Sequence, residues 1–474
     1  MFNFSPQTMI CMIQALFLGC AGATTLPELV QSSLASHPSV RSQEALFRAA
    51  QAGVDSARWQ FFPTPSVGVE QVSASGSDFS YANGDKNVST LRLQQPLWTG
   101  GRLTAGLEKA QASGVLSQAS VQVARQELAV RVVQAYAEWY GGTLKAVAYD
   151  KSLQSHLRLQ QQINRRIEEG VSPQSDRTLV LGRIEQTRTE LIVAEGQQRT
   201  ALSRLSQLLG RPVTSAELAL SLPKPQALDA AQTMVDQALA GSPSVARMVA
   251  NARIQEIEID ERTASLSPEV YLRMERQYGN FNVPNRAPEN RIFFGISSSF
   301  GAGLSVLSTV DNARARYDAA LADLDTARIS LSEEVFGGHV QAATSQRRLL
   351  RLQASLLSAE AVSQAWSQQF LVGLKSWLDV MNAARELAQV EVQIADVSTE
   401  QLLLSWRLSI LARGVDATMS NGQSQLQNAS RTGDLVADGV LGYAHTPNDC
   451  PRADVRQCVG GLYFAISIEQ RPKS

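Results

Sequence analysis

The sequence has little of what catalytic and metal-binding sites are made from. Only four of its 474 residues are histidines, and they lie too far apart in sequence to form a metal-binding motif: His37, His156, His339 and His445. No phosphate-binding loop, dinucleotide fingerprint or nucleophile motif occurs. The lone glycine pairs Gly100-Gly101 and Gly337-Gly338 are expected to mark element boundaries instead. The sequence therefore predicts no enzyme, no cofactor and no metal site.

Excess charge and long apolar runs are also missing. Forty-three basic residues against 44 acidic ones leave a net charge of −1, which provides no basic surface for nucleic acid. After the N-terminus, no apolar run reaches the about 18 residues that a transmembrane helix requires. Nucleic-acid binding and transmembrane helices are therefore excluded.

The N-terminus has the pattern of an export signal. Residues 9–18 form a mostly apolar core, and the Ala-Gly-Ala at 21–23 matches a cleavage site. The usual basic start is missing, because the first Lys or Arg is Arg41. We interpret residues 1–23 as a signal peptide. A buried helix of a cytosolic protein and lipid attachment at Cys20 are the alternatives.

Removal of this signal would leave two cysteines, Cys450 and Cys458, in a polar C-terminal tail. An even pair of cysteines in an exported protein is typical of a disulfide. A metal pair is the weaker alternative, since no histidines cluster around them. We therefore expect a structural disulfide in the tail, residues 415–474.

The chain contains an internal duplication with a spacing near 205 residues. Four elements recur in order, the first two 205 and the last two 203 positions later: Pro38-Ser39-Val40 as Pro243-Ser244-Val245, Pro63 as Pro268, Gly170 as Gly373, and Asp176 as Asp379. Chance does not produce several ordered matches at nearly one spacing. We therefore divide the chain after the signal into a first repeat, 24–220, a second repeat, 221–414, and the tail.

Each repeat shows the same order of helices. An opening helix is expected at 39–62 and 245–266, a very long helix at 102–168 and 304–371, and a return helix at 173–209 and 375–412. Roughly 70 residues at 1.5 Å each span about 100 Å. The opening and return helices together nearly equal the long one, so we expect them to lie end to end beside it. Their many small residues favour close packing around a wet interior, although an ordinary coiled-coil scaffold is the alternative.

Two strands precede each long helix. They are predicted around Val67–Val69 and Leu91–Leu93, and again around Val270–Met274 and Ile292–Phe300, where apolar residues alternate with polar or small ones. Strands of about ten residues with one apolar face fit a transmembrane β-barrel. Four strands cannot close a barrel, so three chains with twelve strands would be required. A soluble sheet is the alternative.

These features resemble the TolC family of outer-membrane channel proteins over roughly residues 25–413. The resemblance rests on six ordered motifs: Pro38-Ser39-Val40, Leu93-Gln94-Gln95-Pro96-Leu97-Trp98, Ala135-Tyr136, Glu169-Gly170-Val171, Leu208-Leu209-Gly210 and Val372-Gly373-Leu374-Lys375-Ser376-Trp377-Leu378-Asp379-Val380. The stretch from Gly373 to Glu386 is most similar to the branch that serves type I secretion of large adhesins. The resemblance implies an α+β membrane protein, in which a homotrimeric 12-stranded transmembrane β-barrel continues into a long periplasmic α-helical coiled-coil tunnel.

The resemblance also implies a location and partners. Such channels lie in the cell outer membrane among its lipids and extend far into the periplasm. They dock on a periplasmic adaptor (membrane fusion) protein and an inner-membrane transporter, here of the ABC type, which supplies the energy. The expected function is therefore a passive duct for an exported protein such as an adhesin, and residues 415–474 could form part of an equatorial collar. The alternatives are a small-molecule or drug efflux duct and, from another class, a structural coiled-coil protein of the envelope.

Glycine and capping signals predict the two hairpin turns. Gly170 and Gly373 stand where each long helix must turn back. Ser172-Pro173 is expected to start one return helix, as a cap followed by a first-turn proline. Ser376 and Asp379 match a capping box, with Asp in place of Glu, at the start of the other.

The resemblance implies that acidic residues in the second hairpin narrow the periplasmic entrance. Asp379 matches one such position and Asn382 stands at the other, so one ring of carboxylates is expected where relatives have two. Three copies of Asp379 around an axis would repel each other unless they bind a cation or are held apart. Lys375 and Asp176 are candidates for the polar bonds that hold neighbouring hairpins closed, and Phe370 stands where relatives often have a tyrosine. The alternative is that Asp379 only caps its helix.

Overall fold

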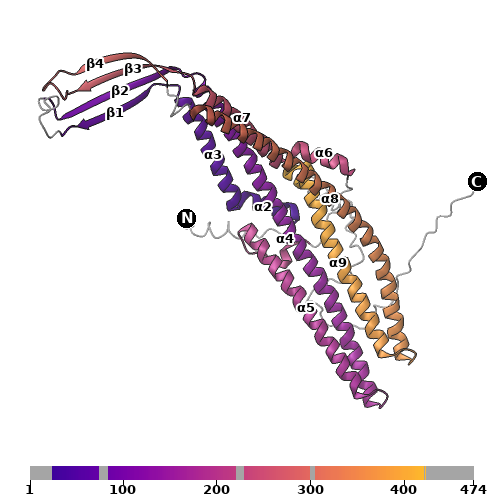
Figure 1. Ribbon diagram of the computed structural model, residues 1–474. Helices are drawn as coiled ribbons and strands as arrows, with labels where there is room; N and C mark the ends of the chain where they lie inside the picture. Colours follow the sequence, from indigo (N-terminus) through magenta and orange to yellow (C-terminus); the bar gives the residue numbers. More distant parts are fainter. Residues whose placement is uncertain (1–23, 74–83, 220–228, 299–304, 421, 423–474) are drawn as a thin grey trace, which may run out of the picture. The chain divides into compact units, whose positions relative to one another are not determined.

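A computed structural model describes residues 24–73, 84–219, 229–298, 305–420 and 422. The predicted signal peptide with Cys20, the cysteines Cys450 and Cys458, and nearly all of the predicted tail lie outside these residues. The described residues form a four-stranded sheet and two long helical hairpins (Figure 1). None of their helices has both the length and the apolar character of a membrane span.

The predicted order of elements is confirmed in both halves of the chain. The first series is α2 (Leu26–Ser36), α3 (Pro38–Trp59), β1 (Thr64–Gln71), β2 (Asn87–Trp98), α4 (Arg102–Glu168), α5 (Gln174–Leu209) and the 3-10 turn η2 (Ser215–Glu217). The second is α6 (Ala231–Gly241), α7 (Pro243–Ala264), β3 (Glu269–Tyr278), β4 (Glu289–Ser297), α8 (Ser305–Leu371) and α9 (Trp377–Arg413). The short helices α2 and α6 were not predicted.

Each long helix has two shorter helices along it, as their lengths predict. Helices α4 and α8 have 67 residues each, while α3 and α7 have 22 each, α5 has 36 and α9 has 37. Helices α3 and α5 pack on α4, and α7 and α9 pack on α8. The shorter pair falls several residues short of the long helix, and at 1.5 Å per residue this leaves a gap of about 13 Å. The unpredicted helix α2 contacts all three helices of the first set, and α6 contacts both α8 and α9.

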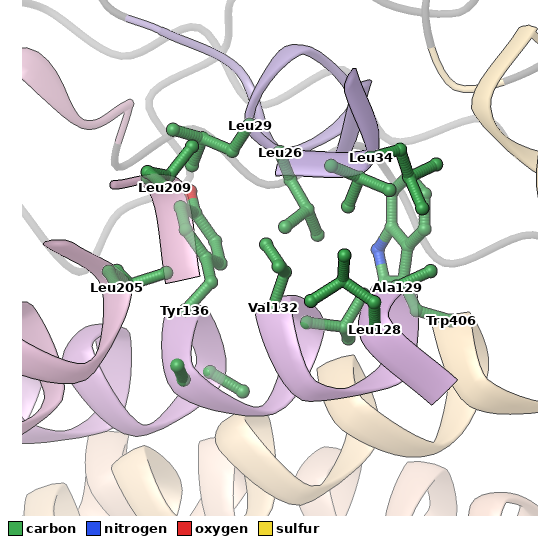
Figure 2. Close-up of a cluster of buried hydrophobic side chains, with 14 of the residues drawn as sticks. Leu26, Leu29, Leu34, Leu128, Ala129, Val132, Tyr136, Leu205, Leu209 and Trp406 are labelled. Atoms are coloured by element: carbon green, nitrogen blue, oxygen red, sulfur yellow. The ribbon is translucent and has the colours of Figure 1, made fainter. Parts of the chain in front are cut away.

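A hydrophobic core forms where α2 lies across the end of α5. Figure 2 shows leucines of α2 facing side chains of α4, with α5 at one side and a tryptophan of α9 at the other: Leu26, Leu29 and Leu34; Leu128, Val132 and Tyr136; Leu205 and Leu209; Trp406. Two hydrogen bonds join the segment after α5 to the α4 side of this core. Trp139 Nε1 donates to Ser215 Oγ at 3.2 Å, and the Tyr136 hydroxyl donates to the Ala219 carbonyl. Burial raises the pKa of Tyr136, with a smaller contribution from Tyr140. The core therefore joins both halves of the chain around α4.

Small residues let the long helices approach each other closely. A Cβ placed on Gly142 of α4 would lie 2.9 Å from the backbone nitrogen of Gln198 on α5. The pair Gly337-Gly338 does not mark an element boundary, as the sequence suggested, but lies inside α8. A Cβ on Gly338 would come within 3.1 Å of Leu408 Cδ2 on α9, so this glycine serves helix packing.

The four strands form one antiparallel sheet in the order β1-β2-β3-β4, so the two halves of the chain join between β2 and β3. Paired residues lie on the same face of a sheet. The pairs Val67–Leu91, Leu93–Met274 and Met274–Ile292 therefore place apolar side chains on one face, which we call the apolar face. The opposite face carries the ion pair of Arg92 with Glu275 at 2.7 Å.

Replacement of Gly142 by alanine should lower the free energy of unfolding by about 1–3 kcal/mol, because its methyl group would push α5 away from α4. Gly114→Ala is the matched control, since Gly114 lies in the same helix and a Cβ placed there would meet no neighbouring atom within 4 Å. Gly114→Ala should raise stability by about 0.5–1 kcal/mol, because alanine favours a helix. Urea denaturation followed by circular dichroism measures both, and equal shifts would contradict close packing at Gly142.

Candidate functional site

The first candidate turn joins α4 to α5. Gly170 has φ of 74°, in the left-handed region that glycine adopts most easily. The amides of Val171 and Ser172 both donate to the carbonyl of Arg166, at 2.8 and 3.2 Å, and close the end of α4. The expected serine cap is wrong: Pro173 is the N-cap of α5, with no side-chain cap bond, and Gln174 is the first helical residue. The amide of Ser172 is still bonded to α4, so the chain leaves the turn one residue later than predicted.

The second candidate turn joins α8 to α9 and contains the capping box that the sequence predicts. Gly373 has φ of 78°, and the Leu374 amide donates to the Gln369 carbonyl at 2.9 Å. The Asp379 amide donates to Ser376 Oγ at 3.2 Å. In return, the amide and the hydroxyl of Ser376 donate to Asp379 Oδ2, at 3.1 and 2.9 Å. The side-chain bond from Ser376, its amide bond and the nearby Lys375 lower the pKa of Asp379.

An apolar cluster, which we call the tip cluster, holds the two hairpins together near these turns. Its buried members come, in this order, from α4, α5, α8 and α9: Leu153, Leu159 and Ile163; Val180 and Ile184; Phe370; Val380 and Met381. Phe370 is only 4% exposed, and the guanidinium carbon of Arg166 lies 5.1 Å from the centre of its ring. The phenylalanine therefore gives an apolar contact, and a cation–π contact, between α8 and α4.

The other predicted site residues do not bond to each other within one chain. Lys375 Nζ lies 4.2 Å from the centre of the Trp366 ring, a cation–π contact inside the second hairpin. Asp176 lies in the first turn of α5, and its amide donates to the Pro173 carbonyl at 3.2 Å. Asn382 lines a cavity between α4, α5 and α9. Among the described residues, no three or more His, Cys, Asp and Glu side chains gather as a metal site would require.

Sequence reasoning missed the contact of Arg166 with Phe370 and that of Trp366 with Lys375. Neither pair is evident in the sequence, because Arg166 and Phe370 belong to different repeats and Trp366 stands nine residues before Lys375, across the turn. The sequence did not show which side chain each residue would face.

The sequence matches the family described as "Outer membrane efflux protein" over residues 29–211 and 234–411. These two segments make up well over half of the chain and begin and end at corresponding places in the two halves. The chain belongs to this family. Family membership makes it an outer-membrane transport channel with a long periplasmic helical part, and not an enzyme. The predicted resemblance to the TolC family is thereby confirmed.

Among relatives, the alkaline protease secretion protein AprF of Pseudomonas aeruginosa is 25% identical over 344 residues, which are 70% of each chain. Two solved structures show the fold of this outer-membrane efflux family. The outer-membrane channel OprN has a TM-score of 0.71 at 21% identity and covers 82% of this chain and 89% of its own. The outer membrane protein VceC from Vibrio cholerae has a TM-score of 0.70 at 17% identity, covering 82% and 96%.

Replacement of Phe370 by alanine should lower the free energy of unfolding by about 3–5 kcal/mol, because it leaves a cavity in the tip cluster. Leu374→Ala is the matched control, since Leu374 follows in the same hairpin but is 76% exposed. Its effect should stay within about 0.5 kcal/mol. Urea midpoints of the two variants give the comparison, and similar losses would show that the tip cluster does not hold the hairpins together.

Asp379 should titrate below the ordinary aspartate pKa of about 3.9. Because its folded pKa is lowered, the stability that its charge provides is complete above about pH 3.9 and is lost as the pH falls through the folded pKa. Ser376→Ala removes the hydroxyl bond and should raise the pKa of Asp379, whereas Ser175→Ala in the other hairpin should not. Carboxyl ¹³C NMR titration measures this pKa, and a value unaffected by Ser376→Ala would contradict the assigned cause.

Proposed function

We propose that the protein is the outer-membrane duct of a type I secretion system and that its cargo is a large protein such as an adhesin. The observation that supports the cargo class is the 25% identity to an alkaline protease secretion protein, over 70% of both chains. In this proposal the energy for transport comes from outside the duct. An adaptor protein in the periplasm and an ABC-type inner-membrane transporter are the proposed partners.

Three copies of the chain are the proposed assembly, with a barrel of twelve strands. The sheet of one chain ends at β1 and β4, whose outer edges have no partner strand among the described residues. An unpaired edge in lipid leaves backbone groups without hydrogen bonds, which costs several kcal/mol for each group. Pairing of β4 with β1 of the next copy removes both edges. The apolar face supports this proposal, because Val67 and Ile292 are 71% and 70% exposed and would contact lipid.

Exposed apolar side chains on the long helices support the same assembly. Helices α5 and α8 carry several large ones that one chain leaves open: Ile192, Ile329, Phe336, Leu350 and Leu357. Large apolar residues at helical spacing are normally covered. In a closed ring of three chains, the helices of the next copy would cover them and form the wall of the tunnel.

The turn at Gly373 is the proposed entrance of the tunnel. Both bonds from Ser376 go to Asp379 Oδ2, so the second oxygen, Oδ1, has no bond among the described residues. Three such oxygens around an axis could bind a cation, and within each chain the bonds from Ser376 lower the pKa of Asp379 and so favour its charged form. Asn382 would provide a neutral ring, and Lys375 and Asp176 would bond to neighbouring chains. Capping and narrowing the entrance are therefore compatible roles for Asp379.

Parts of the chain outside the described residues complete the proposal. Residues 1–23 would be removed on export, and Cys450 and Cys458 would form a disulfide in a tail that contributes to an equatorial collar. Within each chain, the repeats 24–220 and 221–414 would each supply two strands to the barrel and one helical hairpin to the tunnel.

Small-molecule efflux is the second candidate function, because the description of the matched family names efflux. Deletion of the gene separates the two candidates. Loss of one or more proteins from the culture medium or cell surface, with unchanged drug susceptibility, is the result we expect. Increased drug susceptibility with an unchanged set of secreted proteins would support the efflux duct instead.

In planar bilayers, Asp379→Asn should weaken block by divalent cations several-fold, because it removes the charge of every Asp379 from the entrance. The variant should remain a trimer by light scattering in detergent. Asp236→Asn is the matched control, since Asp236 lies on α6, away from both turns. Block that is as strong in Asp379→Asn as in the unmodified protein would leave Asp379 with the capping role only.

A further inference from the structure

The apolar face of the sheet carries one charged residue, Arg276 of β3. Its partners across the sheet are Leu91 on β2 and Asn290 on β4, and it stands two residues after Met274, on the same face. Every other position of this face in the four described strands holds an uncharged residue. An arginine on a face that meets lipid costs free energy in the middle of a membrane and little near its surfaces. The height of Arg276 on the sheet therefore decides what it does.

Arg276 has no carboxylate partner within the part of the chain that the structure describes. Its side chain is exposed, and its guanidinium carbon lies 5.1 Å from the centre of the Tyr278 ring, a cation–π contact. On the opposite face, by contrast, Arg92 and Arg273 both form ion pairs with Glu275, at 2.7 and 3.3 Å. Tyr278 thus orients Arg276, while the positive charge stays available for an anion from outside the chain.

Arg276 lies near the end of β3 that is distant from the helices. This strand begins at Glu269, to which Arg102 of α4 is bonded at 3.2 Å. The seven residues from Glu269 to Arg276 span about 23 Å. Because the helical part of a channel of this family extends into the periplasm, the end of the sheet that holds Arg276 faces away from the periplasm.

The two ends of the apolar face match the two surfaces of a membrane. At the helix end, Trp98 of β2 is 51% exposed, and Trp59 at the end of α3 is 69% exposed. Exposed tryptophans are typical of membrane interfaces. At the other end of β2, the same face changes to the polar residues Asn87 and Ser89, which lie beside the end of β3 that holds Arg276. The arginine therefore stands at the level of lipid headgroups in the proposed barrel.

The chemistry of these headgroups matches a guanidinium group. The outer leaflet of a bacterial outer membrane consists largely of a glycolipid whose sugar part, lipid A, carries phosphate groups. A guanidinium binds a phosphate through two parallel N–H···O bonds, and the apolar face holds no carboxylate that would repel the anion. We propose that Arg276, oriented by Tyr278, binds a phosphate group of lipid A. The proposal rests on the proposed barrel, because a closed barrel is what turns the apolar face toward lipid.

Native mass spectrometry of the full-length protein, released from detergent micelles, tests this by counting bound lipid. The probes are lipid A and the same lipid after removal of its phosphates. We expect one lipid A per chain and about tenfold weaker binding of the dephosphorylated lipid, the effect of losing a charge-assisted contact. An intact trimer that binds both lipids equally would overturn this proposal and leave the duct unaffected. A protein that forms no trimer would overturn both, since its apolar face would not meet lipid.

Two variants show whether Arg276 is the binding residue. Arg276→Gln should weaken lipid A binding by about tenfold and still fold, because the side chain is exposed. Arg291→Gln is the matched control and should bind lipid A as the unmodified protein does. Arg291 follows Asn290, the partner of Arg276, but it lies on the opposite face and pairs with Glu289 at 2.6 Å. Equal losses in both variants, or no loss in Arg276→Gln, would contradict the assigned contact.

Phosphatidylglycerol distinguishes the outer-leaflet glycolipid from an ordinary anionic phospholipid. Its single phosphate is shared between two ester bonds and carries less charge than a phosphate of lipid A. Its binding should be weaker than that of lipid A and should change little in Arg276→Gln. If Arg276→Gln weakened phosphatidylglycerol binding as strongly as lipid A binding, the site would recognise any lipid phosphate, and the assignment to the outer leaflet would be wrong.

Discussion

The structure depends on the close packing of helices along α4. This 67-residue helix contacts α2, α3, α5, α7 and α9, so it packs against helices from both halves of the chain. Such contact requires side chains small enough for backbones to approach, as Gly142 allows at Gln198. Where the shorter helices end, α2 and α6 supply the large apolar side chains that the gaps need. The same packing places the ends of α4 and α8 together, and so brings the two hairpin turns near each other.

The turns combine two kinds of interaction with different tasks. The tip cluster of Phe370 and its neighbours gives non-directional apolar contact between the hairpins. The hydrogen bonds of Ser376 with Asp379, by contrast, fix one side chain in one orientation. In the proposed duct both are useful, because the apolar contact would hold the wall together while the hydrogen bonds keep the charged group of Asp379 in place. In the proposed assembly the energy for transport comes from the partners, so no residue of the duct has to react.

Periodicity and duplication were sufficient to predict the long helices, the four strands and the order of these elements along the chain. These features depend on local sequence, such as the glycine after each long helix and the alternation in each strand. The sequence could not predict that Gly338 packs against Leu408 or that Arg166 covers Phe370, because both depend on which helices become neighbours. Helix α2 was missed for the same reason: its leucines gain their importance from a gap that only the packed helices create. The predicted N-cap of α5 was wrong by one residue, because the residue types in this turn do not determine whether the helix begins after Ser172 or after Pro173.

The two turns of the duplicated hairpins differ in how their return helices begin. Both keep a glycine with positive φ, which each hairpin needs in order to reverse direction. Only the second has a capping box, whereas Pro173 starts the first return helix without a side-chain bond. Ser376 bonds one oxygen of Asp379, lowers its pKa and leaves the other oxygen available. A carboxylate that is charged and held in place would suit a ring at a pore entrance, and its second oxygen is left for water or a cation. The structural bond therefore prepares the same residue for the functional role proposed for it.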